Sequence, residues 1–189
     1  MKRRSLLLGS LATTAGLAWL LRPREKGEDH SSYFRSLSVA LDSDGRSKPT
    51  LVIDRKSLIA NIEVLSSHLK GRFDYRIVAK SLPSLPLLEA VMHQTGSNRL
   101  MLFHQPFVNR VAAHLPQSDV LLGKPMPVAA ARNFYRQFAG GDFNPARQLR
   151  WLLDTPERVA QYAELASGLG QDMLVCIELD VGLRRGGVG

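Results

Sequence analysis

Short apolar runs alternate with amphipathic segments from about residue 50 onward, and this alternation limits the possible folds more than any other feature. The apolar runs lie at residues 51–53, 75–80, 99–103, 119–122, 149–153 and 173–179. Between them, apolar residues recur every three or four positions, which is the period of a helix packed on one side. Continuous apolar strands separated by helices indicate a parallel sheet covered by helices. The sequence therefore predicts an α/β fold, and an open doubly wound sheet and a closed barrel both agree with it.

The basic charge of the chain is concentrated near its start. The formal net charge is +8, and six of the basic residues crowd the first 26 positions: Lys2, Arg3, Arg4, Arg22, Arg24 and Lys26. The other basic residues are scattered, without a run interleaved with aromatic residues, so we expect no nucleic-acid partner. The single cysteine, Cys176, cannot form an intramolecular disulfide, and its apolar neighbours predict a buried thiol.

The first 30 residues have the pattern of a targeting segment. Lys2-Arg3-Arg4 precedes an uncharged apolar run over residues 6–21, which is too short to span a membrane readily. The arginine pair and the residues after it resemble a twin-arginine export signal. We expect an exported protein, periplasmic or attached to the inner membrane by its N-terminus, with an ordinary secretory signal as the alternative. Residues 1–30 are then the signal or anchor, residues 31–49 a linker with one short helix, and residues 50–189 the folded domain.

A lysine ends the second apolar run. Val78-Ala79-Lys80 is followed by a proline-containing turn into the next helix. In α/β barrels the carboxyl ends of the strands carry the chemistry. We expect the strand to bury the stem of Lys80 partly, which would make an uncharged amine available for Schiff-base formation. The alternative is a strand-end lysine that reaches solvent.

The last apolar run ends in a motif with opposite charges. Glu178 and Asp180 occupy alternate positions, and a glycine-rich loop with Arg184 and Arg185 follows them. Alternate residues of a strand point to the same side. A carboxylate on the inner side needs a partner, and an arginine is the best one. The alternative is a loop salt bridge that closes the sheet.

Three further polar residues lie at predicted strand ends. His104 follows the strand at residues 99–103, where its imidazole could stack on a cofactor ring or act as a base, or simply form a hydrogen bond at the rim. Asp154 is either a carboxylate of the rim or part of the helix cap before Pro156. Lys124 is expected to reach solvent.

These motifs together, in this order, resemble the barrel domain of fold-type III pyridoxal-phosphate enzymes. These are the alanine racemase-like proteins, and the D-threonine aldolase and D-serine dehydratase branch is the most similar. The resemblance runs from about residue 49 to the end of the sequence. It implies a (β/α)8 TIM-type barrel, present here as an incomplete barrel of about five or six strands. It also implies pyridoxal 5′-phosphate as the cofactor.

The resemblance assigns roles to individual residues. Lys80 would form the Schiff base with the cofactor, and Arg185 would approach the phenolic oxygen of the cofactor. Glu178 falls where alanine racemases often carry a carbamylated lysine, and its charge would allow it to brace Arg185 directly. The racemases place a tyrosine four residues after the lysine, where this sequence has Ser84. That difference favours the aldolase or dehydratase branch.

The expected function is therefore that of a pyridoxal-phosphate-dependent lyase acting on a small D-amino acid. An amino-acid racemase, a non-catalytic carrier of the cofactor, a truncated inactive fragment and a binding domain without cofactor are the alternatives. The sequence provides no metal site of its own. The resemblance implies a divalent metal held by a C-terminal β-domain beyond residue 189, and a homodimer for the full-length protein.

Overall fold

A computed structural model describes residues 27, 29–69, 71–182 and 186–188. The chain divides into two compact units, one up to Val52 and one from Ile53 onward. The arginine pair and apolar run of the predicted export signal lie outside the described residues. Among the residues that are described, no helix has both the length and the apolar character needed to cross a membrane.

The described part of the first unit contains one helix, α2 (Ser32–Ser43). Its N-cap is Ser31, whose side chain accepts a hydrogen bond from the backbone N–H of Phe34 at 3.5 Å. None of its residues is buried. The short helix predicted in the linker is thus confirmed.

The second unit alternates helices and strands, as the sequence predicted. Its elements are α3 (Arg55–Leu69), β1 (Ile77–Val78), α4 (Leu85–Thr95), β2 (Arg99–Leu102), α5 (Gln105–His114), β3 (Asp119–Leu122), α6 (Val128–Gln137), α7 (Pro145–Gln148), β4 (Leu149–Leu153), α8 (Pro156–Leu169) and β5 (Leu174–Ile177). The strands form one five-stranded sheet in the order β1-β2-β3-β4-β5, and every neighbouring pair is parallel. The α/β class and the parallel sheet are confirmed.

Local signals in the sequence set where the helices begin and end. Thr155 caps α8 by accepting a hydrogen bond from the N–H of Arg158, and Pro156 occupies the first turn, where its missing N–H costs nothing. Helices α4 and α8 end at Gly96 and Gly170, which both adopt the left-handed conformation that glycine tolerates best.

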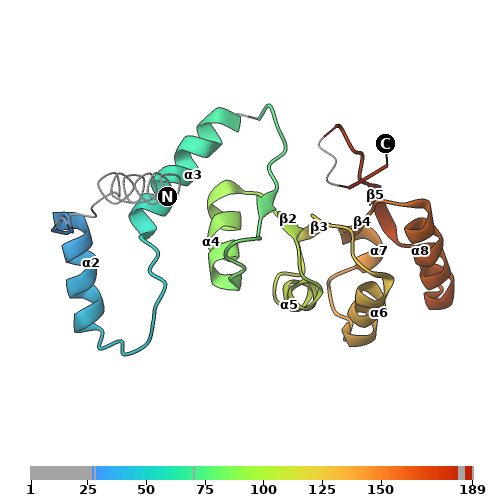
Figure 1. The fold of residues 1–189 in the computed structure, drawn as a ribbon, viewed down its shortest axis with the longest axis horizontal. Coiled ribbons are helices and arrows are strands. Elements are labelled where there is room, and N and C mark those ends of the chain that lie inside the picture. Colours follow the sequence, from blue (N-terminus) through green and yellow to red (C-terminus); the bar gives the residue numbers. More distant parts are fainter. Residues whose placement is uncertain (1–26, 28, 70, 183–185, 189) are drawn as a thin grey trace, which may run out of the picture. The chain divides into compact units, whose positions relative to one another are not determined.

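One face of the sheet carries the core. Alternate residues of the strands point to this face and are fully buried: Leu100, Leu102, Val120, Leu122, Leu149, Trp151 and Leu153. Helices α4, α5, α6 and α8 lie along the same side (Figure 1). Trp151 packs between aromatic rings of two of these helices, with centroid distances of 5.9 Å to Phe134 and 5.8 Å to Tyr162. This aromatic cluster joins β4 to α6 and α8.

The opposite face of the sheet is less buried. Its apolar residues include Val78, Met101, Leu121, Leu152 and Cys176, all half-buried or exposed. Arg150 lies beside Leu121 in the register of β3 and β4, so this face also carries charge. The prediction of a buried thiol at Cys176 was therefore wrong. The reason is position, because Cys176 lies on the outermost strand and on the less covered face.

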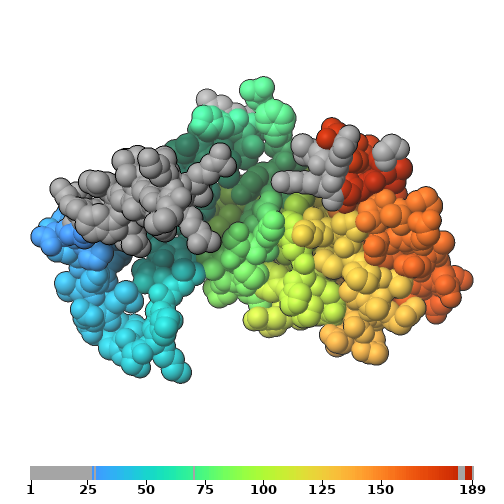
Figure 2. Space-filling view, in the orientation of Figure 1, coloured from blue at the N-terminus to red at the C-terminus, as the bar shows by residue number. Residues whose placement is uncertain are grey.

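Consecutive strand–helix pairs of the second unit pack side by side in chain order. The surface of the second unit in Figure 2 changes from green through yellow to orange as the chain proceeds. The strand order also follows the chain without reversal. Each strand–helix pair therefore packs mainly against the pair before it and the pair after it in the chain.

Two of the predicted strands differ from the structure. Residues 51–53 form no strand, and Leu51, Val52 and Ile53 are 69%, 42% and 44% exposed. This run has no partner strand, so its apolar character alone does not produce one. The strand predicted at residues 75–80 shortens to the two residues of β1, which has a neighbour on one side only among the described strands. The sheet consequently has five strands, which agrees with the five or six expected.

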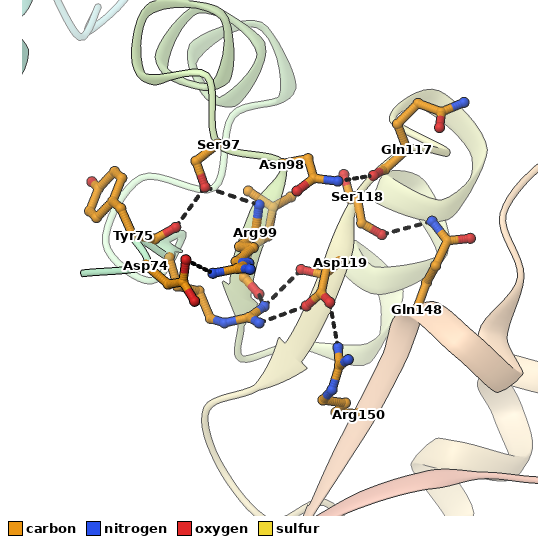
Figure 3. Close-up of polar contacts among 12 residues, drawn as sticks. Asp74, Tyr75, Ser97, Asn98, Arg99, Gln117, Ser118, Asp119, Gln148 and Arg150 are labelled. Atoms are coloured by element: carbon orange, nitrogen blue, oxygen red, sulfur yellow. Dashed lines mark hydrogen bonds and ion pairs between the residues drawn. The ribbon is translucent and has the colours of Figure 1, made fainter. Parts of the chain in front are cut away.

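A network of charges ties three strands together at the amino-terminal edge of the sheet. The guanidinium of Arg76 donates to Oδ1 of Asp119 at 2.6 Å and to the carbonyl oxygens of Leu100 and Asp119 at 2.9 and 2.8 Å. Arg150 donates to Oδ2 of Asp119 at 2.6 Å (Figure 3). Both carboxylate oxygens of Asp119 are thus occupied, and the side chain links the segment entering β1 with β3 and β4.

The surroundings of Asp119 favour its charged form. Burial on its own raises the pKa of a carboxyl group, but the hydrogen bonds and positive charges of Arg76 and Arg150 outweigh it and lower the pKa of Asp119. The folded state therefore binds the proton of Asp119 less readily than the unfolded state does.

Replacing Asp119 by asparagine should destabilise the second unit. The change removes the shared counter-charge and leaves two arginines facing each other, so we expect the free energy of unfolding to fall by about 2 kcal/mol, allowing for partial exposure. Urea denaturation followed by circular dichroism measures this. Asp74→Asn is the matched control, because Asp74 pairs with Arg99 at the same edge but is 83% exposed. Equal midpoints for the two variants would contradict the prediction.

The same contact should make stability depend on pH. The folded-state pKa of Asp119 lies below its unfolded value of about 3.9, so ionised Asp119 contributes its full stabilisation at pH values above the unfolded pKa. This stabilisation is lost as the pH falls through the folded-state pKa. The difference in unfolding free energy between the native chain and Asp119→Asn should hold from about pH 7 to 5 and shrink below about pH 4. Urea titrations at several pH values test this, and a difference that stays constant down to acid pH would refute it.

Candidate functional site

The carboxyl ends of the five strands lie at one edge of the sheet. Three backbone hydrogen bonds extend the ladder beyond the strands: Ala79 N–H to Met101 O at 3.0 Å, Gly123 N–H to Leu102 O at 2.8 Å and Glu178 N–H to Leu153 O at 2.8 Å. The residues that follow the strands are therefore held in register. They include Lys80, His104, Lys124, Asp154 and Glu178, which the sequence had marked as polar strand ends.

A pocket of about 340 Å³ lies at this edge, beside the ends of β1 and β2. It is lined by Ala79, Lys80, Pro83, Phe103, His104, Pro106, Phe107 and Arg110. The structure thus brings Lys80 and His104 together, as expected for side chains from neighbouring strand ends.

Lys80 is exposed rather than partly buried, so the expected desolvation of its side chain is not found. The reason is the position of β1 at the side of the sheet, where a side chain meets solvent. Its amine nevertheless has a defined position, because Nζ lies 5.6 Å from the centre of the Phe103 ring. An ammonium group above an aromatic face is attracted to it. Phe103 therefore forms a platform for Lys80.

Gly123 makes room for this platform. A side-chain Cβ at position 123 would lie 2.4 Å from both Cε1 and Cζ of Phe103 and 2.9 Å from Cγ of Met101. Carbon atoms do not approach so closely, so the ring of Phe103 requires glycine on the neighbouring strand. The sequence analysis missed both residues. The alternation along β2 held the signal, because Phe103 lies two residues after Met101 and so faces the same side.

The backbone of His104 begins helix α5, and its ring lies at the pocket. Its carbonyl oxygen accepts hydrogen bonds from the N–H groups of Phe107 and Val108 at 3.0 and 3.2 Å, which begins α5. The imidazole makes no capping hydrogen bond and is exposed. It is therefore accessible to a molecule bound beside Lys80.

Asp154 belongs to a structural ion pair. Its Oδ1 accepts a hydrogen bond from Nε of Arg158 at 2.6 Å, and Arg158 also donates to the carbonyl oxygen of Met126 at 2.7 Å. The buried hydroxyl of Tyr162 donates to the same carbonyl at 3.0 Å, and burial raises the pKa of Tyr162. These contacts fasten the start of α8 to the loop before α6. Lys124 is exposed, as predicted.

Glu178 lies at the other end of the sheet from Lys80. Strands β2, β3 and β4 separate the two, and Glu178 does not line the Lys80 pocket. Its carbonyl oxygen accepts a hydrogen bond from Val188 N–H at 2.8 Å, so the glycine-rich loop folds back onto the end of β5. Gly187 is required there, because a Cβ would lie 2.7 Å from the Asp180 nitrogen. Arg185, the predicted partner of Glu178, lies outside the described residues.

Ser84 begins α4 through its backbone, whose carbonyl oxygen accepts a hydrogen bond from Leu88 N–H at 2.9 Å. It is half-buried and does not line the Lys80 pocket.

A larger pocket of about 400 Å³ lies at the opposite, amino-terminal edge of the sheet. Its charged groups already satisfy each other, since Arg99 donates to Asp74 at 2.6 Å, and the hydroxyl of Ser97 donates to the carbonyl oxygen of Tyr75 (Figure 3). No group of three or more His, Cys, Asp or Glu side chains suited to a metal ion occurs in the part of the chain that the structure describes. The pocket beside Lys80 is therefore the better candidate site.

Comparisons with known proteins leave the family open. No protein-family model matches the chain, and no curated protein matches it.

Gly123→Ala should displace the Phe103 ring. The added methyl group overlaps the ring, so we expect a loss of about 1–3 kcal/mol in unfolding free energy and a changed ring-current shift at the ε-methylene protons of Lys80. Nuclear magnetic resonance measures that shift. Gly168→Ala is the control, because Gly168 lies in α8 with open space around it and alanine should stabilise the helix. An unchanged Lys80 signal in Gly123→Ala would show that the ring does not depend on this glycine.

Proposed function

We propose that the chain is the N-terminal part of a pyridoxal-phosphate-dependent barrel enzyme, with the cofactor attached covalently at Lys80. The proposal rests mainly on the position of Lys80 at the carboxyl end of a parallel strand. Lys80 lines a pocket there, and its amine lies above the ring of Phe103. Enzymes with parallel α/β barrels keep their catalytic residues at this edge.

The order of the strands supports the barrel. A doubly wound sheet reverses its strand order at a switch point, whereas β1 to β5 follow the chain without reversal. The helices lie along one face, and the other face is largely apolar beyond its charged amino-terminal edge, with Met101, Leu121 and Leu152 at its centre. Such a face suits the packed interior of a closed barrel better than a solvated surface.

The lining of the pocket fits one end of the cofactor. The exposed amine of Lys80 is accessible to an aldehyde, and the imidazole of His104 lies in the same lining. When bound, pyridoxal phosphate supplies an electron sink that stabilises negative charge on the substrate carbon. Lys80 would hold the cofactor, Phe103 would orient the Lys80 side chain, and the ring nitrogens of His104 would be available for a hydrogen bond to the bound compound.

A lyase acting on a small D-amino acid, of the aldolase or dehydratase type, is the proposed reaction class. It rests on the resemblance and on Ser84, which stands where the racemases have tyrosine. The metal-binding C-terminal domain, the homodimer and the exported location belong to the same proposal.

A non-catalytic carrier of the cofactor is the second candidate. It is favoured by the exposure of Lys80 and by the absence of Glu178 from the lining of the pocket. A cofactor held at an exposed amine by few groups would be easy to hand on to another protein.

Reductive trapping tests attachment at Lys80. The Lys80 amine would join the aldehyde carbon with loss of water, and borohydride would then deliver hydride to that carbon while solvent supplies the proton to nitrogen. We expect peptide mapping to place the pyridoxyl group on Lys80, and Lys80→Ala to abolish the labelling.

Lys124→Ala is the matched control, because Lys124 is also exposed and also lies two residues beyond its strand. It should keep full labelling. Equal labelling of both lysines, or labelling that survives Lys80→Ala, would refute the assignment of Lys80.

A further inference from the structure

The charges around the Lys80 pocket are of one sign. Lys80, His104 and Arg110 are the ionisable residues of its lining, which contains no carboxylate. All three side chains are exposed at the pocket. A pocket lined in this way attracts anions, and the attraction is strongest at low ionic strength.

Arg110 differs from the arginines of the sheet. Arg76, Arg99 and Arg150 each pair with an aspartate at the amino-terminal edge. The guanidinium of Arg110 has no ion pair or hydrogen bond to any residue that the structure describes, although it lines the pocket. Its five N–H donors are therefore available to a ligand.

The rest of the lining is apolar. Phe103, Phe107, Pro83 and Pro106 supply rings and carbon surfaces. A guanidinium matches the geometry of a carboxylate or a phosphate, to which it can donate two parallel hydrogen bonds. The lining therefore suits a compound with a flat or apolar body and an oxyanion at one end.

We propose that the pocket contains an oxyanion subsite, in which Arg110 recognises the phosphate or carboxylate of the compound that reaches Lys80. This inference deepens the proposed function and rests on it. Phosphate would come from the cofactor and carboxylate from an amino-acid substrate, and the two share the same recognition chemistry.

Two aldehydes that differ in one phosphate group test the phosphate source. The full chain is treated at low salt with pyridoxal 5′-phosphate or with pyridoxal, reduced with borohydride and mapped at Lys80. Arg110→Gln should raise the half-saturating concentration of the phosphorylated aldehyde about three- to fivefold, the scale of an exposed charge contact, and leave that of pyridoxal unchanged. Arg132→Gln is the control, because Arg132 is an exposed arginine of α6 outside the pocket.

A second readout works without any labelling. The ring protons of His104 are followed by nuclear magnetic resonance while inorganic phosphate or acetate is added, with His104→Gln to identify the signals. We expect an Arg110-dependent shift with phosphate if the cofactor is the source, and with acetate if a substrate carboxylate is the source.

The outcomes separate the two proposals. An unlabelled Lys80 together with an Arg110-dependent anion shift would refute cofactor attachment but retain the subsite. Labelling of Lys80 that ignores the phosphate group, together with anion shifts that persist in Arg110→Gln, would overturn the subsite and leave Lys80 as assigned.

Discussion

Burial of one face of the parallel sheet against its helices is the constraint on which the rest of the second unit depends. The strands alternate strictly, so packing Leu100, Val120 and Trp151 beneath the helices turns Met101, Leu121 and Leu152 to the other face. The same alternation turns Phe103 toward Lys80 and Gly123. The location of the candidate site is thus a consequence of the core packing of the alternate residues on each strand, such as Leu100 and Leu102 on β2.

Much of this fold follows from the sequence because its signals are local. Apolar runs, helix periodicity, the cap at Thr155 and the glycines at positions 96 and 170 are all read within a few residues. Residues 51–53 show where such reasoning fails, since an apolar run becomes a strand only when another strand pairs with it. Cys176 shows that apolar neighbours in the sequence do not determine burial. Its burial depends on whether its strand lies in the middle or at the side of the sheet.

Only part of the candidate site was predictable from the sequence, which marked Lys80 and His104 but not Phe103, Gly123 or Arg110. Lys80 and His104 were each placed at a predicted strand end, and both line the same pocket. The separation of Glu178 from Lys80 depends on the order of the strands in space, which the sequence does not state. The platform under Lys80 depends on a missing side chain, because Gly123 contributes only the space into which Phe103 fits. Sequence analysis aimed at reactive groups overlooks a residue whose role is to be small.

The strand order has a consequence for how the domain is made. Among the five strands that the structure describes, each pairs with the strand before it in the chain, so none of these pairings waits for a distant segment. Parallel sheets usually form slowly because their contacts are far apart in sequence, but here each closure spans only one helix and its loops. During synthesis, every new strand–helix unit can dock on its predecessor as soon as it leaves the ribosome. The domain can therefore grow in the direction of translation, with the start of the Lys80 pocket complete when β2 and α5 are in place.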